Sequence, residues 1–297
     1  MHPYFYSAFG LVIKSQCECP ELMSAPEQEY QASVEWGMVP EHLEDATLLG
    51  TWIEGLPHKL LFRITGVAQY LVEDGNRITI QLEEGASTDE ARLFLLGSAM
   101  GALLHQRGLL PFHGSSICTG AKAITFTGPS GIGKSTLAAA MVNKKYHLLA
   151  DDVSAISFEG QKALVNPGMP QLKLYKDSIQ KLNRDTSHAV PLSQKRDKFG
   201  CPEHPSFILQ AFPAQTIFIL SPGQDAGFKA TPLSGLDKFI ALRNNTYRPY
   251  FVKAMGIQQA HFDLIRLLAS QVDVYLLSRP DTGFEIDELA GFVDNMI

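Results

Sequence analysis

Cysteine is scarce in this chain, with four in 297 residues. So few cysteines exclude the disulfide framework that stabilises many secreted domains. Cys17 and Cys19 form a C-x-C pair without a second pair of ligands, so we do not expect a zinc site. We expect Cys118 in a buried strand and Cys201 in a loop. All four thiols are compatible with a reducing cytoplasm.

Long apolar runs and basic blocks are also lacking. No apolar run reaches the roughly 18–20 residues that a membrane span requires, and the N-terminal residues do not resemble a signal peptide. The net charge is -6 without a long basic block, which argues against nucleic-acid binding. A 45% hydrophobic and 19% charged composition is typical of a globular protein. The sequence therefore predicts a cytoplasmic protein that binds neither membranes nor nucleic acids.

The sequence does contain a phosphate-binding motif. Residues 128–135 read GPSGIGKS and fit the pattern G-x-x-x-x-G-K-[ST] at every position. A β-rich run at 123–127 precedes the motif and a helix-forming run at 136–142 follows it. Glycines let backbone N–H groups turn inward around an anion, and the helix N-terminus favours negative charge there. The alternative is a glycine-rich turn before an ordinary helix.

This motif predicts a site for ATP and Mg²⁺. Lys134 is expected to reach the outer phosphates, and the Ser135 hydroxyl to bind the metal. The predicted nucleotide-binding residues are Gly128, Ser130, Gly131, Ile132, Gly133, Lys134, Ser135 and Thr136.

Two carboxylates follow the next expected strand, at 146–150. Asp151 is placed to bind Mg²⁺ or its water, and Asp152 to take a proton or orient a nucleophile. A turn in which aspartates make local hydrogen bonds is the alternative. Upstream, His113 is a weaker candidate for a phosphate contact, because a histidine among apolar residues is more often simply packed.

A cation is needed to neutralise the transferring phosphoryl group. Arg243 and Arg248 flank a helix break at Asn244-Asn245, and either could serve. We select Arg243. The alternative is a surface arginine that is favoured at a helix C-terminus by the helix dipole.

At these residues the chain resembles the HPr kinase/phosphorylase family. The resemblance rests on His113-Gly114, the 128–135 loop and Leu149-Ala150-Asp151-Asp152, in this order and at similar spacing. It implies a P-loop domain related to phosphoenolpyruvate carboxykinase, and ATP-dependent phosphorylation of a protein serine. It further implies that Asp151 lies beside the metal, that Asp152 is the general base, and that His113 contacts the transferring phosphate.

The resemblance has departures. Thr136 stands where the bifunctional enzyme has Glu, and residues 165–174 replace its E-[IV]-R-G-L-G-type signature. These departures leave the reverse reaction and HPr as the acceptor open. The chain looks more like the HPr-kinase-like proteins encoded beside peptide-maturation genes, including lasso-peptide clusters. The runs 104–108, 167–172 and 242–248 carry that likeness. Some such relatives phosphorylate a serine at the C-terminal end of a precursor peptide.

Two domains are expected. Residues 1–108 predict a smaller, β-rich α+β domain with strands near 9–13, 32–36, 60–64, 69–72 and 77–82. It ends in a helix from Ser87 to Gln106, where Ser87 and Glu90 have capping-box spacing. Residues 109–297 predict an α/β P-loop kinase domain in which helices and buried strands alternate. The polar stretch 183–199 is either a functional lid or disordered.

The sequence therefore predicts a Mg²⁺- and ATP-dependent kinase that phosphorylates a serine of a protein or peptide, with a lasso-type precursor peptide favoured. The predicted catalytic residues are Asp152, Asp151, His113, Lys134 and Arg243, and the predicted metal ligands are Ser135 and Asp151. Three alternatives stay open: an HPr serine kinase of carbohydrate regulation, a P-loop ATPase switch without a polypeptide acceptor, and a non-catalytic scaffold. A small-molecule acceptor and a homo-oligomer stay open as well.

Overall fold

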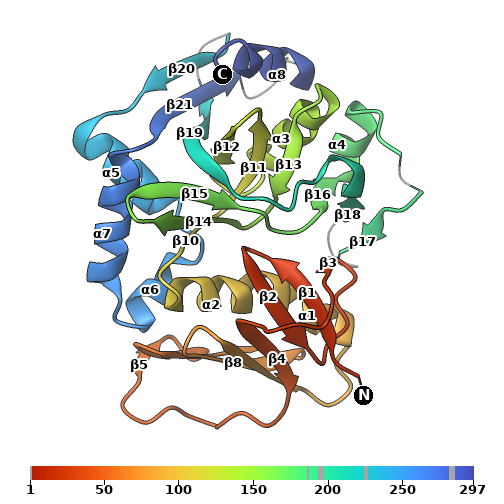
Figure 1. Cartoon of the computed structure of the whole chain (residues 1–297), viewed down its shortest axis with the longest axis vertical. Coiled ribbons are helices and arrows are strands. Elements are labelled where there is room, and N and C mark those ends of the chain that lie inside the picture. The colour runs from red at the N-terminus through yellow and green to blue at the C-terminus, as the bar shows by residue number, and fades with distance from the viewer. Residues whose placement is uncertain (1, 186, 193–196, 224–226, 281–284) are drawn as a thin grey trace. The chain divides into compact units, whose positions relative to one another are not determined.

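The computed structural model describes residues 2–185, 187–192, 197–223, 227–280 and 285–297 (Figure 1). The chain divides into two compact units. The first comprises Met1–Pro111 and Thr246–Leu264, and the second comprises Phe112–Asn245 and Ile265–Ile297. The sequence places its boundary at 108/109, whereas the structure divides the chain at Pro111 and returns 246–264 to the first unit. Residues 246–264 join the first unit through long-range packing. Ala254 lies so close to Gly55 that a Cβ at Gly55 would be 2.4 Å from the Ala254 backbone.

The first unit is built on a nine-stranded sheet in the order β3-β1-β2-β4-β9-β8-β7-β6-β5. Its strands are β1 (Tyr4–Ala8), β2 (Leu11–Ser15), β3 (Met23–Ser24), β4 (Ala32–Trp36), β5 (Thr47–Leu49), β6 (Ile53–Leu56), β7 (Lys59–Ile64), β8 (Ala68–Glu73) and β9 (Arg77–Leu82). The expected strand at 9–13 begins two residues later, because Phe9 (φ 57°) and Gly10 (φ 78°) form the turn between β1 and β2.

The expected helix at 87–106 has three segments: α1 (Thr88–Phe94), the π-helix η1 (Leu95–Ala99) and α2 (Met100–Gln106). The Ser87 hydroxyl caps it by accepting from the Asp89 N–H at 3.2 Å. This bond goes to the second residue of the helix, and the described contacts join Ser87 to Glu90 in neither direction, so the predicted capping box does not form. The unit is completed by α6 (Pro249–Ala254) and the first residues of α7 (Gln258–Ala269).

The second unit is mixed α/β around a twisted sheet. Three strands run parallel at its centre: β12 (Lys122–Thr127), β19 (Phe212–Gly223) and β21 (Asp273–Pro280). The others pair antiparallel with their neighbours: β11 (Gly114–Thr119), β13 (His147–Ala150), β14 (Ser154–Glu159), β15 (Lys162–Asn166) and β20 (Lys229–Pro232). The short β10 (Leu110–Phe112) contains the division between the units.

Helices α3 (Lys134–Asn143) and α8 (Ile286–Asp294) share a fully buried core with β12 and β19, which includes Phe126, Leu137 and Phe218. Two shorter helices, α4 (Lys176–Lys181) and α5 (Gly235–Asn244), belong to the same unit. This core fixes where β12 ends and α3 begins, and therefore fixes the loop between them.

A three-stranded sheet of β16 (Gln171–Tyr175), β18 (Lys198–Pro202) and β17 (Val190–Pro191) precedes the short 3₁₀ helix η2 (His204–Ser206). Cys201 lies buried in β18 rather than in the expected loop, because β18 pairs with β16. Cys118 is buried in β11, as the sequence predicts. The stretch 183–199 contains β17 and the start of β18, while Lys195 and Arg196 lie outside the described residues.

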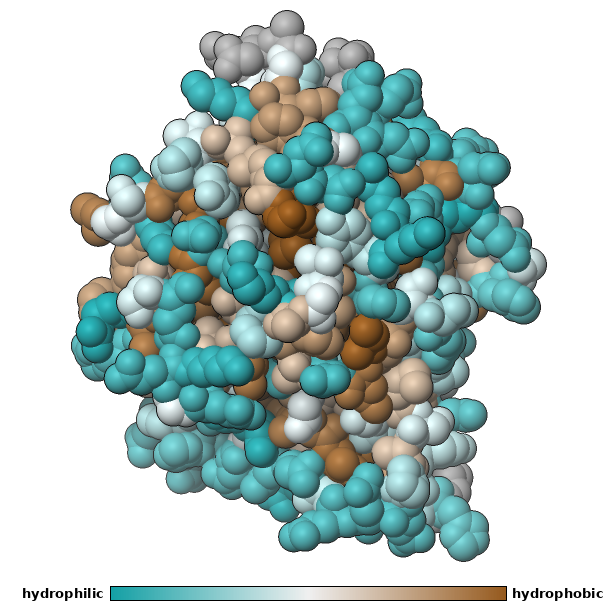
Figure 2. Space-filling model, turned by 45° about the horizontal axis from the view of Figure 1, so that its top comes forward, coloured by the Kyte–Doolittle hydropathy of each residue, from teal (hydrophilic) through white to brown (hydrophobic). Residues whose placement is uncertain are grey.

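The hydrophobic residues are gathered mainly inside the two units. The face in Figure 2 is mostly hydrophilic, and hydrophobic residues show there as patches between polar ones. In the part of the chain that the structure describes, no helix combines the length and the hydropathy needed to cross a membrane.

Candidate functional site

The glycine loop, residues 128–133, connects the end of β12 to the first residue of α3. Gly128 has φ 139°, and a Cβ there would lie 2.6 Å from the Leu220 carbonyl oxygen of β19. Gly131 (φ 82°) and Gly133 (φ 103°) also have positive φ, but a Cβ at either would meet nothing within 4 Å. The first glycine is thus required by the neighbouring strand, whereas the other two border open space.

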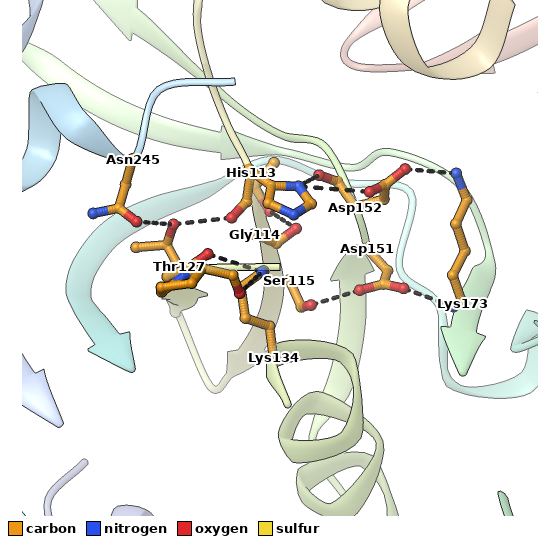
Figure 3. A network of polar contacts seen from close by, with 12 residues as sticks. His113, Gly114, Ser115, Thr127, Lys134, Asp151, Asp152, Lys173 and Asn245 are labelled. Atoms are coloured by element: carbon orange, nitrogen blue, oxygen red, sulfur yellow. Dashed lines mark hydrogen bonds and ion pairs between the residues drawn. The ribbon is translucent and has the colours of Figure 1, made fainter. Parts of the chain in front are cut away.

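Lys134 is buried and folds over this loop (Figure 3). Its ammonium donates hydrogen bonds to the carbonyl oxygens of Gly128 and Pro129, both at 2.9 Å. Burial lowers the pKa of Lys134 to about 8, although the carboxylates of Asp151 and Asp152 oppose the shift. The amine lies where a phosphate bound by the loop would offer it a stronger, charged partner.

Asp151 directly follows β13 and is 1% exposed. One carboxylate oxygen accepts from the Ser115 hydroxyl at 2.5 Å, and the other accepts from the Lys173 N–H at 2.7 Å. Ser115 lies on β11 and Lys173 on β16, so the carboxylate holds three segments together. Each oxygen keeps a lone pair for a metal ion or for its water.

Asp152 has a left-handed backbone, with φ 71°. Its carboxylate pairs with the ammonium of Lys173 at 2.7 Å, and both side chains are largely buried. Burial alone would raise the pKa of Asp152, but the charge and hydrogen bond of Lys173, followed by the charges of His113 and Lys198, hold it well below its usual range. Asp152 is therefore ionised at neutral pH.

The ring of His113 lies against the same carboxylate. Its Nδ1 is 3.2 Å from the main-chain oxygen of Asp152 and 3.6 Å from a carboxylate oxygen. Burial, and then the charge of Lys134, lower the pKa of His113 against the opposing effect of Asp152. The histidine is therefore neutral at neutral pH, and Nδ1 carries the proton when it donates to the main-chain oxygen.

Three residues of the site were missed by sequence reasoning. The side-chain oxygen of Asn245 is 3.1 Å from the Thr127 hydroxyl, and its main-chain oxygen accepts from the His113 N–H at 3.1 Å. Arg279 donates to the Ile132 carbonyl oxygen in the glycine loop at 3.0 Å. The third is Lys173. The sequence marks Asn245 as part of a helix break and of the run 242–248 without giving it a role in the site, and no motif marks Arg279.

The remaining predicted residues lie less centrally. The Thr136 hydroxyl lies 2.9 Å from the Ser178 hydroxyl of α4. Ser135 is half-buried at the start of α3, and Ser130 is exposed in the loop. Arg243 is exposed on the last turn of α5, and the described contacts do not join it to the glycine loop or to the aspartates. The structure brings Arg279, not Arg243, to the loop.

These residues fit a nucleotide's phosphates. The described residues contain no group of three or more His, Cys, Asp or Glu side chains that could hold a metal ion. Mg²⁺ is usually bound by one or two carboxylates together with substrate phosphates, rather than by an all-protein cage. Asp151, Asp152 and Ser135 supply that kind of partial ligand set beside a loop in which Gly131 and Gly133 border open space.

Replacing Lys173 with Met tests the pairing around Asp152. We expect the unfolding free energy at pH 7 to fall by up to the roughly 3–5 kcal/mol seen when one partner of a buried pair is removed. Because Asp152 has a depressed pKa in the folded state, the pair stabilises the protein above the unfolded-state pKa of about 3.9 and loses this effect in stronger acid. Urea unfolding at pH 7 and pH 2.5 measures both values.

The difference in unfolding free energy between Lys173→Met and the wild type should therefore become smaller as the pH falls below 4. The control is Lys162→Met, at an exposed position that begins β15. A difference that is the same at both pH values would contradict the assignment of the charge on Asp152.

No protein-family model matches the sequence, and no curated protein is significantly similar to it. Among solved structures, the chain is similar to the HPr(Ser) kinase/phosphatase from Coxiella burnetii. The two are 10% identical, and the match covers 63% of this chain and 95% of that one, with a TM-score of 0.34. So distant a likeness carries no argument about activity.

Proposed function

We propose that this chain is a Mg²⁺- and ATP-dependent kinase that transfers a phosphoryl group to a serine hydroxyl of a protein or peptide. One observation carries the proposal. The glycine loop with Lys134, the aspartates 151–152 and His113 gather in one unit, around a single network of polar contacts (Figure 3).

The loop residues bind and orient the nucleotide. Main-chain N–H groups of the loop and of the first turn of α3 would donate to the phosphates, and the helix N-terminus favours their charge. The Ile132 N–H is the exception, since it donates to the Pro129 carbonyl oxygen at 3.3 Å. Lys134 exchanges its two carbonyl partners for phosphate oxygens, and Arg279 fixes the loop through Ile132. Bound Mg²⁺ would neutralise charge on the phosphates, with Ser135 and Asp151 as its protein-side partners.

Asp152 and His113 orient the acceptor. Phosphoryl transfer relies mainly on positioning and electrostatics, so the acceptor hydroxyl needs alignment more than it needs a strong base. A carboxylate with a depressed pKa is a weak base but a permanently charged hydrogen-bond acceptor, which suits this role. Lys173 holds the Asp152 carboxylate in place, and Asn245 holds the His113 backbone.

The resemblance to HPr-kinase-like proteins encoded beside peptide-maturation genes suggests a precursor peptide as the acceptor. The protein would be incubated with γ-labelled ATP and Mg²⁺, with the precursor peptide encoded nearest its gene and with HPr in parallel. We expect one phosphate on the peptide, measured by intact mass and lost when its serine is replaced by alanine. Phosphorylation of HPr would instead indicate a serine kinase of carbohydrate regulation. Phosphate released with neither acceptor labelled would contradict the kinase and support an ATPase switch.

A further inference from the structure

A pocket of about 340 Å³ lies within the first unit, formed by β6, β7, α1 and the segment 248–251. Aromatic side chains dominate its lining. Phe62 and Phe251 are buried, whereas Trp52 and Tyr250 are 51% and 37% exposed. The volume is in the range of small-molecule and side-chain binding sites. All lining residues belong to the first unit, and none comes from the phosphate loop.

Arg248 brings a positive charge into this pocket. One of its guanidinium nitrogens donates to the Tyr250 hydroxyl at 2.7 Å, and the group lies 5.5 and 5.9 Å from the ring centroids of Tyr247 and Tyr250. Its Nε is buried and has no hydrogen-bond partner among the described residues. An unsatisfied buried donor costs free energy unless a ligand completes it.

The charge of Arg248 is also uncompensated. Arg63, which lines the same pocket, pairs with the Glu54 carboxylate at 2.9 Å. No described carboxylate lies within ion-pair distance of Arg248. The pocket therefore holds one net positive charge surrounded by aromatic surface, which matches a ligand with one negative charge.

Two backbone irregularities support this arrangement. Arg248 adopts a left-handed conformation, with φ 49° and ψ 57°, which is unfavourable for a non-glycine residue. The π-helix at 95–99 adjoins the pocket-lining Phe94, and a Cβ at Gly101 would lie 2.7 Å from the ring of Tyr247. Both π-helices and strained residues occur frequently at binding sites.

We propose that this pocket binds a carboxylate carried on an aromatic or aliphatic body, with Arg248 as the anion-binding residue. The guanidinium of Arg248 would pair with the carboxylate through a charge-assisted hydrogen bond from a terminal nitrogen. Trp52, Phe62 and Phe251 would contact the apolar body. The carboxylate could belong to a peptide C-terminus or to a free organic acid. The proposal does not rest on the proposed kinase function.

Calorimetric titration of the full chain tests it with two matched probe pairs. The first pair is 3-phenylpropanoate and its neutral amide, and the second is the peptide Gly-Ser-Gly-Ser-Gly-Phe with a free or an amidated C-terminus. We expect each acid to bind at least about tenfold more tightly than its amide, because charge-assisted hydrogen bonds are lost in the amide. If the peptide acid binds more tightly than 3-phenylpropanoate, the ligand is assigned as a peptide C-terminus. If the peptide acid binds no more tightly than 3-phenylpropanoate, the ligand is assigned as a free organic acid.

Arg248→Gly should remove this preference for the acid, since glycine keeps the left-handed backbone without strain. Its matched control is Asp45→Gly, at an exposed left-handed position with φ 59° outside the pocket, and it should bind the acids like the wild type. Equal binding of acid and amide by the wild type, or no binding of either acid at millimolar concentration, would overturn the proposal. Undiminished acid binding by a folded Arg248→Gly would overturn it too.

Discussion

Replacing Asp152 with Asn is expected to lower the rate of phosphoryl transfer by at least about 100-fold, the lower end of the contribution of a positioned catalytic carboxylate. Asn has nearly the same shape but carries no charge, so it neither aligns the acceptor hydroxyl as strongly nor balances Lys173 at 2.7 Å. Nucleotide affinity should change little, because the glycine loop and Lys134 are untouched. Single-turnover transfer and equilibrium nucleotide binding measure the two effects separately.

The control is Asp273→Asn, at an exposed position at the start of β21. The pH profile of phosphoryl transfer distinguishes a general base from a charged hydrogen-bond acceptor that only aligns the hydroxyl, which are the two possible roles of Asp152. Its pKa lies well below the usual range, so wild-type activity should show no acidic limb from this group between pH 5 and 8. Near-normal turnover by Asp152→Asn would remove this carboxylate from the mechanism.

Replacing Lys134 with Ala is expected to weaken ATP binding at least about tenfold and to reduce transfer further. The variant removes a charged donor to the phosphates, and a hydrogen bond to a charged group contributes about 1.5–3 kcal/mol. Fluorescence titration with a labelled ATP analogue measures the affinity. Lys181→Ala, at an exposed position on α4, is the matched control and should bind ATP normally.

The same lysine predicts a pH dependence. Since burial lowers the pKa of Lys134 to about 8 in the free protein, the ammonium is lost as the pH rises through that value. ATP affinity should therefore decrease above pH 8 in the wild type, because binding then requires the uptake of a proton. The decrease should be absent in Lys134→Ala. An identical pH dependence in both proteins would contradict the role of Lys134.

The sequence predicts local elements of this fold well where signals are short-range. The strands at 32–36 and 77–82 have the predicted bounds, and β12, the glycine loop and α3 follow in the predicted order. The glycine motif can be recognised in one sequence because all of its residues lie within the single run 128–135. The same is true of Asp151-Asp152 at the end of β13.

Long-range packing accounts for what the sequence did not reveal. Lys173, Asn245 and Arg279 are 21, 93 and 127 residues from Asp152 along the chain. They reach the site from β16, from the end of α5 and from β21, so only tertiary packing brings them together. The contact between the hydroxyls of Thr136 and Ser178 also depends on where α4 packs. The return of 246–264 to the first unit likewise depends on close packing of Ala254 against Gly55.

The measurement that tests the central claim most directly is a calorimetric titration of the unaltered protein with MgATP and, side by side, with adenosine. The glycine loop recognises phosphates through main-chain N–H groups and Lys134, so the account predicts that MgATP binds and that adenosine binds at least about tenfold more weakly. Equal affinity for the two, or no binding of MgATP, would contradict the assignment of residues 128–135 as a nucleotide phosphate site.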